Sequence, residues 1–167
     1  SIKELNVFFE NGKITEVSNR VPTDETVIDA KGLYVAPCMI DVHTHGRNGS
    51  DTMYATFKDL NNISVSELKT GVTSFLPTTM TMPAEDIKKA IAAGYDNKDK
   101  VEGAKILGMH LEGPFFSVKY KGAQPEECMI APTVENYLSF AGEHPDFVKK
   151  ISLAPEIEGA VDLIKYL

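Results

Sequence analysis

The sequence predicts an α/β fold in which parallel strands alternate with helices. Three observations support this prediction: strand-like apolar runs recur over residues 37–167, helical patterns of apolar residues lie between them, and Gly or Pro often follows a run. Alternation of strands and helices is typical of βαβ units. Four such units can form a small open sheet or one half of an eight-stranded barrel. Because the chain stops within a helical pattern, we expect the half-barrel.

Residues 1–36 read as a separate β-rich unit. Two short strands are expected over 5–9 and 13–17, joined by Asn11-Gly12, a strong hairpin signal. Two more are expected over 27–28 and 33–35. The unit has too few apolar residues to form a core by itself.

Four longer strands are expected over residues 38–42, 72–76, 105–111 and 148–154, the first of which is a continuous apolar run with one carboxylate. Helices are expected between and after them, over residues 55–70, 83–94, 133–140 and 157–167. Gly71 suits the end of the first helix, Pro83 the start of the second and Thr133 the cap of the third.

Composition excludes several classes of protein. The net charge of −7 and the acidic pI near 5.1 argue against a nucleic-acid surface. The apolar runs are too short to span a membrane, and no secretion is expected, because no basic-then-apolar pattern is present in the first residues given. Cys38 and Cys128 lie far apart, which excludes zinc fingers and disulfide scaffolds and favours a reducing cytoplasm. We interpret both cysteines as small buried residues.

The sharpest candidate site is the segment DVHTHG over residues 41–46. Residues two apart on a strand point to the same side, so His43 and His45 can reach one metal ion. Neutral imidazoles suit zinc, iron, nickel or cobalt. Asp41 shares their side and could orient an imidazole. The alternative is a pair of surface histidines on a turn.

A second candidate is the segment HLEGPF over residues 110–115. Glu112 ends an expected strand, where barrel active sites are built, and its carboxylate can hold or bridge cations. His110 lies on the same side and is either a ligand or a packed residue of the sheet, the second reading being preferred.

Four weaker candidates lie in loops. Thr78 and Thr79 offer hydroxyls after the second long strand, although plain structural roles are favoured for them. Arg47 could attract an anion, but a solvated loop arginine is the preferred reading, and His144 is expected to face solvent. Gln124 could bind a sugar or amide.

These motifs together resemble the N-acetylglucosamine-6-phosphate deacetylases of the amidohydrolase superfamily. The resemblance rests on five segments of the chain: APCMIDVHTHG at 36–46, TGVTSFLPTT at 70–79, GMHLEGPF at 108–115, KGAQP at 121–125 and LAPE at 153–156. It implies a metal-dependent (β/α)8 barrel with an accessory β-sandwich. Residues 1–36 would then be part of the sandwich, and residues 37–167 the first four βα units.

The resemblance also implies a function and its residues. Glu112 would be a metal ligand, with His43 and His45 binding a second ion in relatives that keep both. The metal would be divalent, zinc or iron, in one or two ions, and Ala123 and Gln124 would contact the amino sugar. The parent enzyme would be a cytoplasmic homodimer that hydrolyses the acetamide of N-acetylglucosamine 6-phosphate to acetate and the free amine.

One departure from the family pattern matters most. The family's later histidine ligands and its proton-transferring aspartate are expected beyond Leu167, so no catalytic residue is expected within this chain. We therefore interpret the chain as the N-terminal portion of a longer enzyme, inactive alone. Two alternatives stay open: an N-acetylgalactosamine-6-phosphate deacetylase, and a non-catalytic half-barrel remnant.

Overall fold

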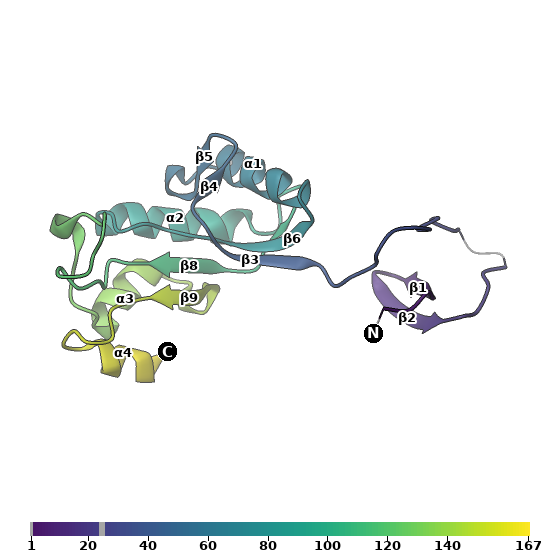
Figure 1. The fold of residues 1–167 in the computed structure, drawn as a ribbon. Helices are drawn as coiled ribbons and strands as arrows, with labels where there is room; N and C mark the ends of the chain where they lie inside the picture. Colours follow the sequence, from purple (N-terminus) through teal and green to yellow (C-terminus); the bar gives the residue numbers. More distant parts are fainter. Residues whose placement is uncertain (1, 24–25) are drawn as a thin grey trace. The chain divides into compact units, whose positions relative to one another are not determined.

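The computed structural model describes residues 2–23 and 26–167 (Figure 1). The chain divides into two compact units, residues 1–36 and 37–167. In the described part of the chain, no helix is both long enough and apolar enough to cross a bilayer.

The first unit is built around one antiparallel hairpin. β1 (Asn6–Glu10) pairs with β2 (Lys13–Ser18), and Asn11 and Gly12 turn the chain with φ of 51° and 75°, as the Asn-Gly signal predicts. The expected strands over 27–28 and 33–35 do not form. Their apolar side chains are exposed, Ile28 and Tyr34 by 76% and 80%. An extended segment becomes a strand only when a partner pairs its N–H and C=O groups, and β1 and β2 pair only with each other.

The second unit contains a set of parallel strands that follow one another in chain order. β3 (Met39–Thr44), β6 (Val72–Pro77) and β7 (Lys105–Ile106) form one sheet, while β8 (Met109–Glu112) pairs with β9 (Val148–Ser152). A bridge between Thr78 and His110 connects the two sheets. The expected strand over 105–111 is therefore divided, with β7 continuing beside β6 and β8 turning to β9. Gly108 lies at the division, where a Cβ atom would come within 2.6 Å of the Phe147 carbonyl oxygen.

Four helices alternate with these strands: α1 (Phe57–Leu68), α2 (Ala84–Asn97), α3 (Val134–Ala141) and α4 (Ala160–Tyr166). Thr56 and Thr133 cap α1 and α3 by accepting hydrogen bonds from the amides of Asp59 and Asn136. The expected end of the second helix near Gly94 is wrong. Gly94 lies inside α2, where a Cβ atom would come within 2.5 Å of the Met109 sulfur, so close packing of helix on strand explains this glycine.

Short elements complete the second unit. β4 (Gly46–Arg47) and β5 (Ser50–Asp51) form a hairpin directly after β3, and three single-turn 3-10 helices follow at Thr52–Tyr54, Glu126–Cys128 and Pro145–Phe147. Sequence analysis predicted a loop where this hairpin lies.

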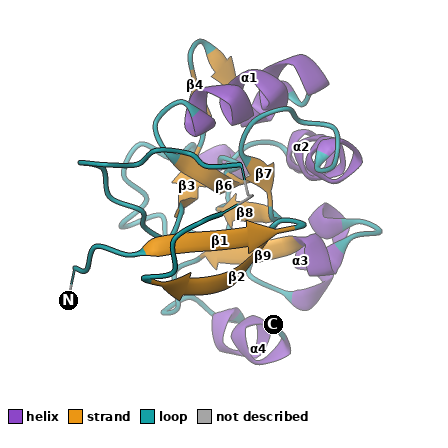
Figure 2. Ribbon diagram, turned by 90° about the vertical axis from the view of Figure 1, so that its right-hand side faces the viewer, coloured by secondary structure: helices purple, strands orange, loops and turns teal. Residues whose placement is uncertain are grey.

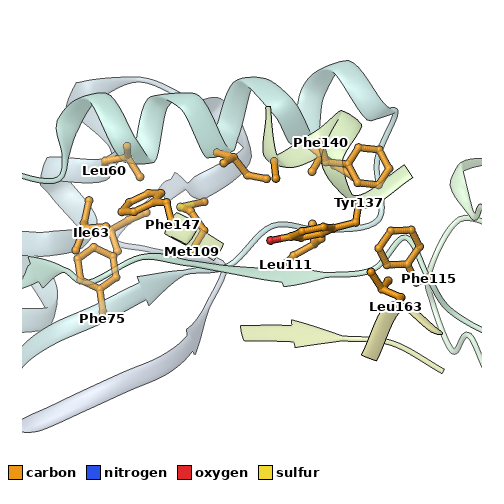
Figure 3. Packing of buried hydrophobic residues seen from close by; sticks show 14 of the residues in the cluster. Leu60, Ile63, Phe75, Met109, Leu111, Phe115, Tyr137, Phe140, Phe147 and Leu163 are labelled. Carbon is orange, nitrogen blue, oxygen red and sulfur yellow. The ribbon is translucent and has the colours of Figure 1, made fainter. Parts of the chain in front are cut away.

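The core lies between the strands and the helices. In Figure 2 the helices surround the strands of this unit on their outer side, and Figure 3 shows the side chains between them. Met109 and Leu111 of β8 are completely buried in this cluster, whereas His110 and Glu112 alternate with them and point to the opposite side. The cluster takes residues from all four helices and from β6, β7 and β8: Leu60, Ile63, Phe75, Ile87, Ile91, Ala104, Ile106, Met109, Leu111, Phe115, Tyr137, Phe140, Ala141, Phe147 and Leu163.

Candidate metal centre

Two strand ends bring His43, His45 and Glu112 together on the side of the strands opposite the core. His43 belongs to β3, His45 follows it immediately, and Glu112 ends β8. One carboxylate oxygen of Glu112, Oε2, lies 2.7 Å from His45 Nε2 and 3.2 Å from His43 Nε2. The two Nε2 atoms are 3.3 Å apart. Residues almost seventy positions apart therefore present three donor atoms to one point.

This triangle of atoms fits a divalent metal ion. Nitrogen and oxygen ligands bind zinc at about 2.0–2.2 Å, which places neighbouring ligand atoms roughly 3–3.5 Å apart. The observed separations are close to this range, and the three groups form a metal-competent cluster among the described residues. Two imidazoles and a carboxylate suit zinc or iron.

Asp41 acts on the backbone and not on an imidazole. Its Oδ1 atom accepts a hydrogen bond of 2.9 Å from the backbone N–H of His43. The prediction that Asp41 orients a histidine ring is therefore wrong. Its carboxylate binds a nearby backbone amide of the same strand instead.

His110 is a packed residue of the sheet. Its side chain is completely buried, with Nε2 2.8 Å from Ser152 Oγ and Nδ1 3.3 Å from Thr78 Oγ1. Both ring nitrogens thus have protein partners, which favours the structural reading over metal ligation. Burial, the charge of Lys150 and the two site histidines lower the pKa of His110 to about 4, so the ring is neutral near pH 7.

The stability of the metal-free chain should consequently fall as the pH is lowered from about 7 to about 4. His110 stays neutral in the folded state down to about pH 4, while in the unfolded state it takes up a proton near pH 6.5. The unfolded state therefore binds more protons in this window and gains stability. Urea unfolding at pH 7 and pH 5 should show that the free energy of unfolding falls less for His110→Gln than for the unsubstituted chain. An equal loss would contradict this assignment.

The hairpin that follows the histidines is anchored to α1. Arg47 Nη1 lies 2.9 Å from Glu67 Oε2, and the Glu67 side chain is only 2% exposed. Asn62 of α1 donates to the Asn48 carbonyl and the Ser50 hydroxyl. Arg47 is therefore an ion-pair partner and not a solvated loop arginine.

Removing this arginine should destabilise the chain measurably. Arg47→Ala leaves the Glu67 carboxylate buried without its partner, which should cost about 2 kcal/mol of unfolding free energy. Lys89→Ala is the matched control, because its partner Asp86 is 3.5 Å away and both side chains are well exposed; that change should cost less than about 0.5 kcal/mol. Urea unfolding checks both variants, and equal effects would contradict a special role for the Arg47–Glu67 pair.

Sequence reasoning did not single out Glu67 or Asn62. The signal for Glu67 is present, because it continues the apolar stripe of Leu60 and Ile63 at helical spacing. A carboxylate on the buried face of a helix implies a buried cation partner. Asn62 carries no comparable signal.

The predicted sugar-contacting residues lie in the loop after β8. Gln124 donates its backbone N–H to the Lys121 carbonyl, and its side-chain Oε1 atom is buried without a hydrogen-bond partner in the described chain. Ala123 beside it is exposed. No hydrogen bond within the described residues connects either one to the histidines or Glu112, so their contact with a sugar remains a prediction.

Two weaker expectations, for the cysteines and for His144, need correction. Cys38 is exposed and Cys128 is half-buried, so neither is a core residue. His144 stacks on Tyr95 with ring centroids 3.4 Å apart and is half-buried, so it does not simply face solvent. Thr78 and Thr79 are completely buried, which agrees with the structural roles favoured for them.

Comparison with known proteins shows what this chain is similar to. It is 42% identical over 132 residues to an N-acetylglucosamine-6-phosphate deacetylase of Vibrio furnissii, covering 78% of this chain and 33% of that protein. A Bacillus subtilis protein of the same name is 37% identical over 173 residues, covering 99% and 44%. The crystal structure of the deacetylase of that name from Pasteurella multocida superposes with a TM-score of 0.86 at 29% identity, covering 98% and 44%.

The chain thus spans between a third and a half of the length of these relatives. A scan of protein-family models gave no match.

Proposed function

The chain is related, over most of its length, to part of the N-acetylglucosamine-6-phosphate deacetylases, and we propose that it supplies metal-binding and substrate-binding residues to such an enzyme. The longer protein would hydrolyse the acetamide of N-acetylglucosamine 6-phosphate to glucosamine 6-phosphate and acetate. The observation that carries this proposal is the convergence of His43, His45 and Glu112 at two strand ends. The names of the relatives support deacetylation as the reaction. The convergence of the three side chains supports a metal ion as its catalyst.

The residues of this chain would hold the ion and one side of the sugar. A bound divalent ion would supply an activated water and polarise the amide oxygen. Glu112 and the two histidines would fix its position, as one ion or as a pair. Gln124, whose buried Oε1 atom has no partner in the described chain, would accept a hydrogen bond from the amino sugar, beside Ala123. The proton would be moved by an aspartate expected outside residues 1–167.

The proposed architecture is an amidohydrolase barrel with an accessory β-sandwich. Four parallel strands in chain order, with helices on one side, support assigning residues 37–167 to the first half of a (β/α)8 barrel. The Lys150 ammonium of β9 reaches the Val42 carbonyl of β3 at 3.3 Å, which supports a strongly curved inner side. Residues 1–36 would belong to the sandwich. A cytoplasmic location and a homodimer are proposed with the enzyme.

The proposal is tested by assaying acetate release by the longer protein. We expect turnover of N-acetylglucosamine 6-phosphate, slower turnover of the galactosamine epimer, and loss of both after chelation of the metal. The 167-residue chain should be inactive alone, if the proton-transferring aspartate lies outside residues 1–167 as proposed. Preference for the galactosamine epimer would favour the alternative substrate, and inactivity of a metal-loaded longer protein on both sugars would favour the non-catalytic remnant.

A further inference from the structure

Two consecutive threonines lie between the two segments that carry the metal cluster. We call these segments the histidine arm, which carries His43 and His45, and the carboxylate arm, which carries Glu112. Thr78 and Thr79 follow β6 directly, and neither side chain has any exposed surface. β6 pairs with β3, which carries the histidines, and the Thr78 bridge to His110 leads to β8, which carries Glu112. The threonine pair therefore occupies the seam between the two ligand-bearing strands.

Thr78 holds the histidine arm through two reciprocal hydrogen bonds. Its backbone N–H donates to the Thr44 carbonyl at 2.9 Å, and its hydroxyl oxygen accepts from the Thr44 backbone N–H at 3.0 Å. The hydroxyl is also 3.1 Å from the Leu76 carbonyl oxygen, to which it donates. Thr44 is the residue between His43 and His45. Thr78 thus fixes the peptide groups from which both imidazoles project.

Thr79 repeats this arrangement on the carboxylate arm. Its backbone N–H donates to the His110 carbonyl at 3.0 Å, and its hydroxyl oxygen accepts from the Glu112 backbone N–H at 3.3 Å. One dipeptide therefore bonds the backbone of both arms in the same way. Both threonines are completely buried, and Thr44 and Glu112 are half-buried, so losing a hydroxyl removes the protein partner of a backbone N–H that has limited access to water.

We propose that Thr78 and Thr79 are positioning residues that set the separation of the two imidazoles from the Glu112 carboxylate. They act through the backbone and need not touch a metal or a substrate. The proposal rests on the metal site of the proposed function, and it adds the two side chains that fix the relative positions of its ligands.

The test measures cobalt affinity in the 167-residue chain, by competition with a chromophoric chelator and by the visible spectrum of bound Co²⁺. Thr78→Val and Thr79→Val keep the shape of the side chain and remove the hydroxyl. Each should weaken Co²⁺ binding by at least about 10-fold, the lower end of the effects known for residues that support metal ligands. Thr78→Ser and Thr79→Ser keep the hydroxyl and should recover to within about 3-fold.

Thr52→Val is the matched control. Thr52 is equally buried, and its hydroxyl has no partner among the described residues. This variant should bind Co²⁺ within about 2-fold of the unsubstituted chain, since no hydrogen bond is lost. A merely structural role for the pair would lower the melting temperature of the metal-free chain without changing cobalt affinity or spectrum.

Two results would overturn the proposal. One is cobalt affinity of both valine variants within 2-fold of the unsubstituted chain. The other is an unsubstituted chain whose cobalt binding is absent or unchanged by His45→Gln, since the cluster would then bind no metal. Inactivity of the longer protein on sugar phosphates, with the cobalt pattern intact, would instead overturn the deacetylase assignment and leave this positioning role standing.

Discussion

Replacing Glu112 by glutamine in the longer protein should abolish most metal binding and most deacetylation. The substitution keeps the size of the side chain but removes the negative charge, and the Oε2 atom of Glu112 lies 3.2 Å from His43 Nε2 and 2.7 Å from His45 Nε2. Changes to residues that only support a ligand cost about 10–100-fold in metal affinity or activity, so losing a ligand's charge should cost at least that much.

Metal content and turnover should be measured for Glu112→Gln beside His43→Gln. The histidine variant should be milder if one ion suffices, because Glu112 and His45 still face each other at 2.7 Å. An equal collapse of both variants would favour an obligate two-metal site in which the carboxylate bridges the ions. Near-normal metal content and turnover of Glu112→Gln would remove Glu112 from the ligand set.

Replacing Gly46 by alanine should cost at least about 3 kcal/mol of unfolding free energy, because it forces atoms into a packed backbone. A Cβ atom at Gly46 would lie 2.1 Å from the Ser50 carbonyl oxygen and 2.8 Å from the Asp51 Cα atom. Both are backbone atoms of β5 and cannot rotate away. Since Gly46 follows His45, the β4–β5 hairpin should separate and carry the imidazole away from Glu112, so cobalt affinity should fall as well.

Gly49→Ala is the control within the same hairpin. Gly49 has a φ of +80°, and no atom lies within 4 Å of an added Cβ. Only the left-handed backbone conformation opposes this change, and it should lower the free energy of unfolding by about 1–2 kcal/mol. Urea unfolding and cobalt titration of both variants measure the difference. If Gly46→Ala is no more damaging than Gly49→Ala, close approach of the strands does not explain Gly46.

Local chemistry predicted most elements of the second unit. Thr133 caps α3 as expected, and each long apolar run contains a strand. The predictions fail where a residue distant in the sequence determines the local structure. Gly94 looked like the end of a helix, but it is the point at which α2 packs on Met109. The expected strands over 27–28 and 33–35 have suitable β propensity, yet no strand among the described residues pairs with them.

For the site, the residue types and their alternation along the strands predicted which side chains could share a metal ion. His43 and His45 face the same way because a strand repeats every two residues. The sequence could not predict that Arg47 pairs with Glu67, or that Asp41 bonds to an amide and not to a ring. The Arg47–Glu67 pair depends on the distance between segments twenty positions apart, and the Asp41 contact depends on which of its near neighbours the carboxylate faces in the folded strand.

By itself the sequence determined the α/β class, the order of strands and helices, and the three candidate ligands, because these depend on periodicity and side-chain chemistry that each short segment carries. Only the tertiary structure decided that His45 Nε2 and Glu112 Oε2 lie 2.7 Å apart, and that buried threonines bond the strands holding them. Such distances follow from how β3, β6 and β8 pair side by side. Burial of a common apolar core, to which all four helices contribute, places β6 and β8, whereas β3 is held by its parallel pairing with β6.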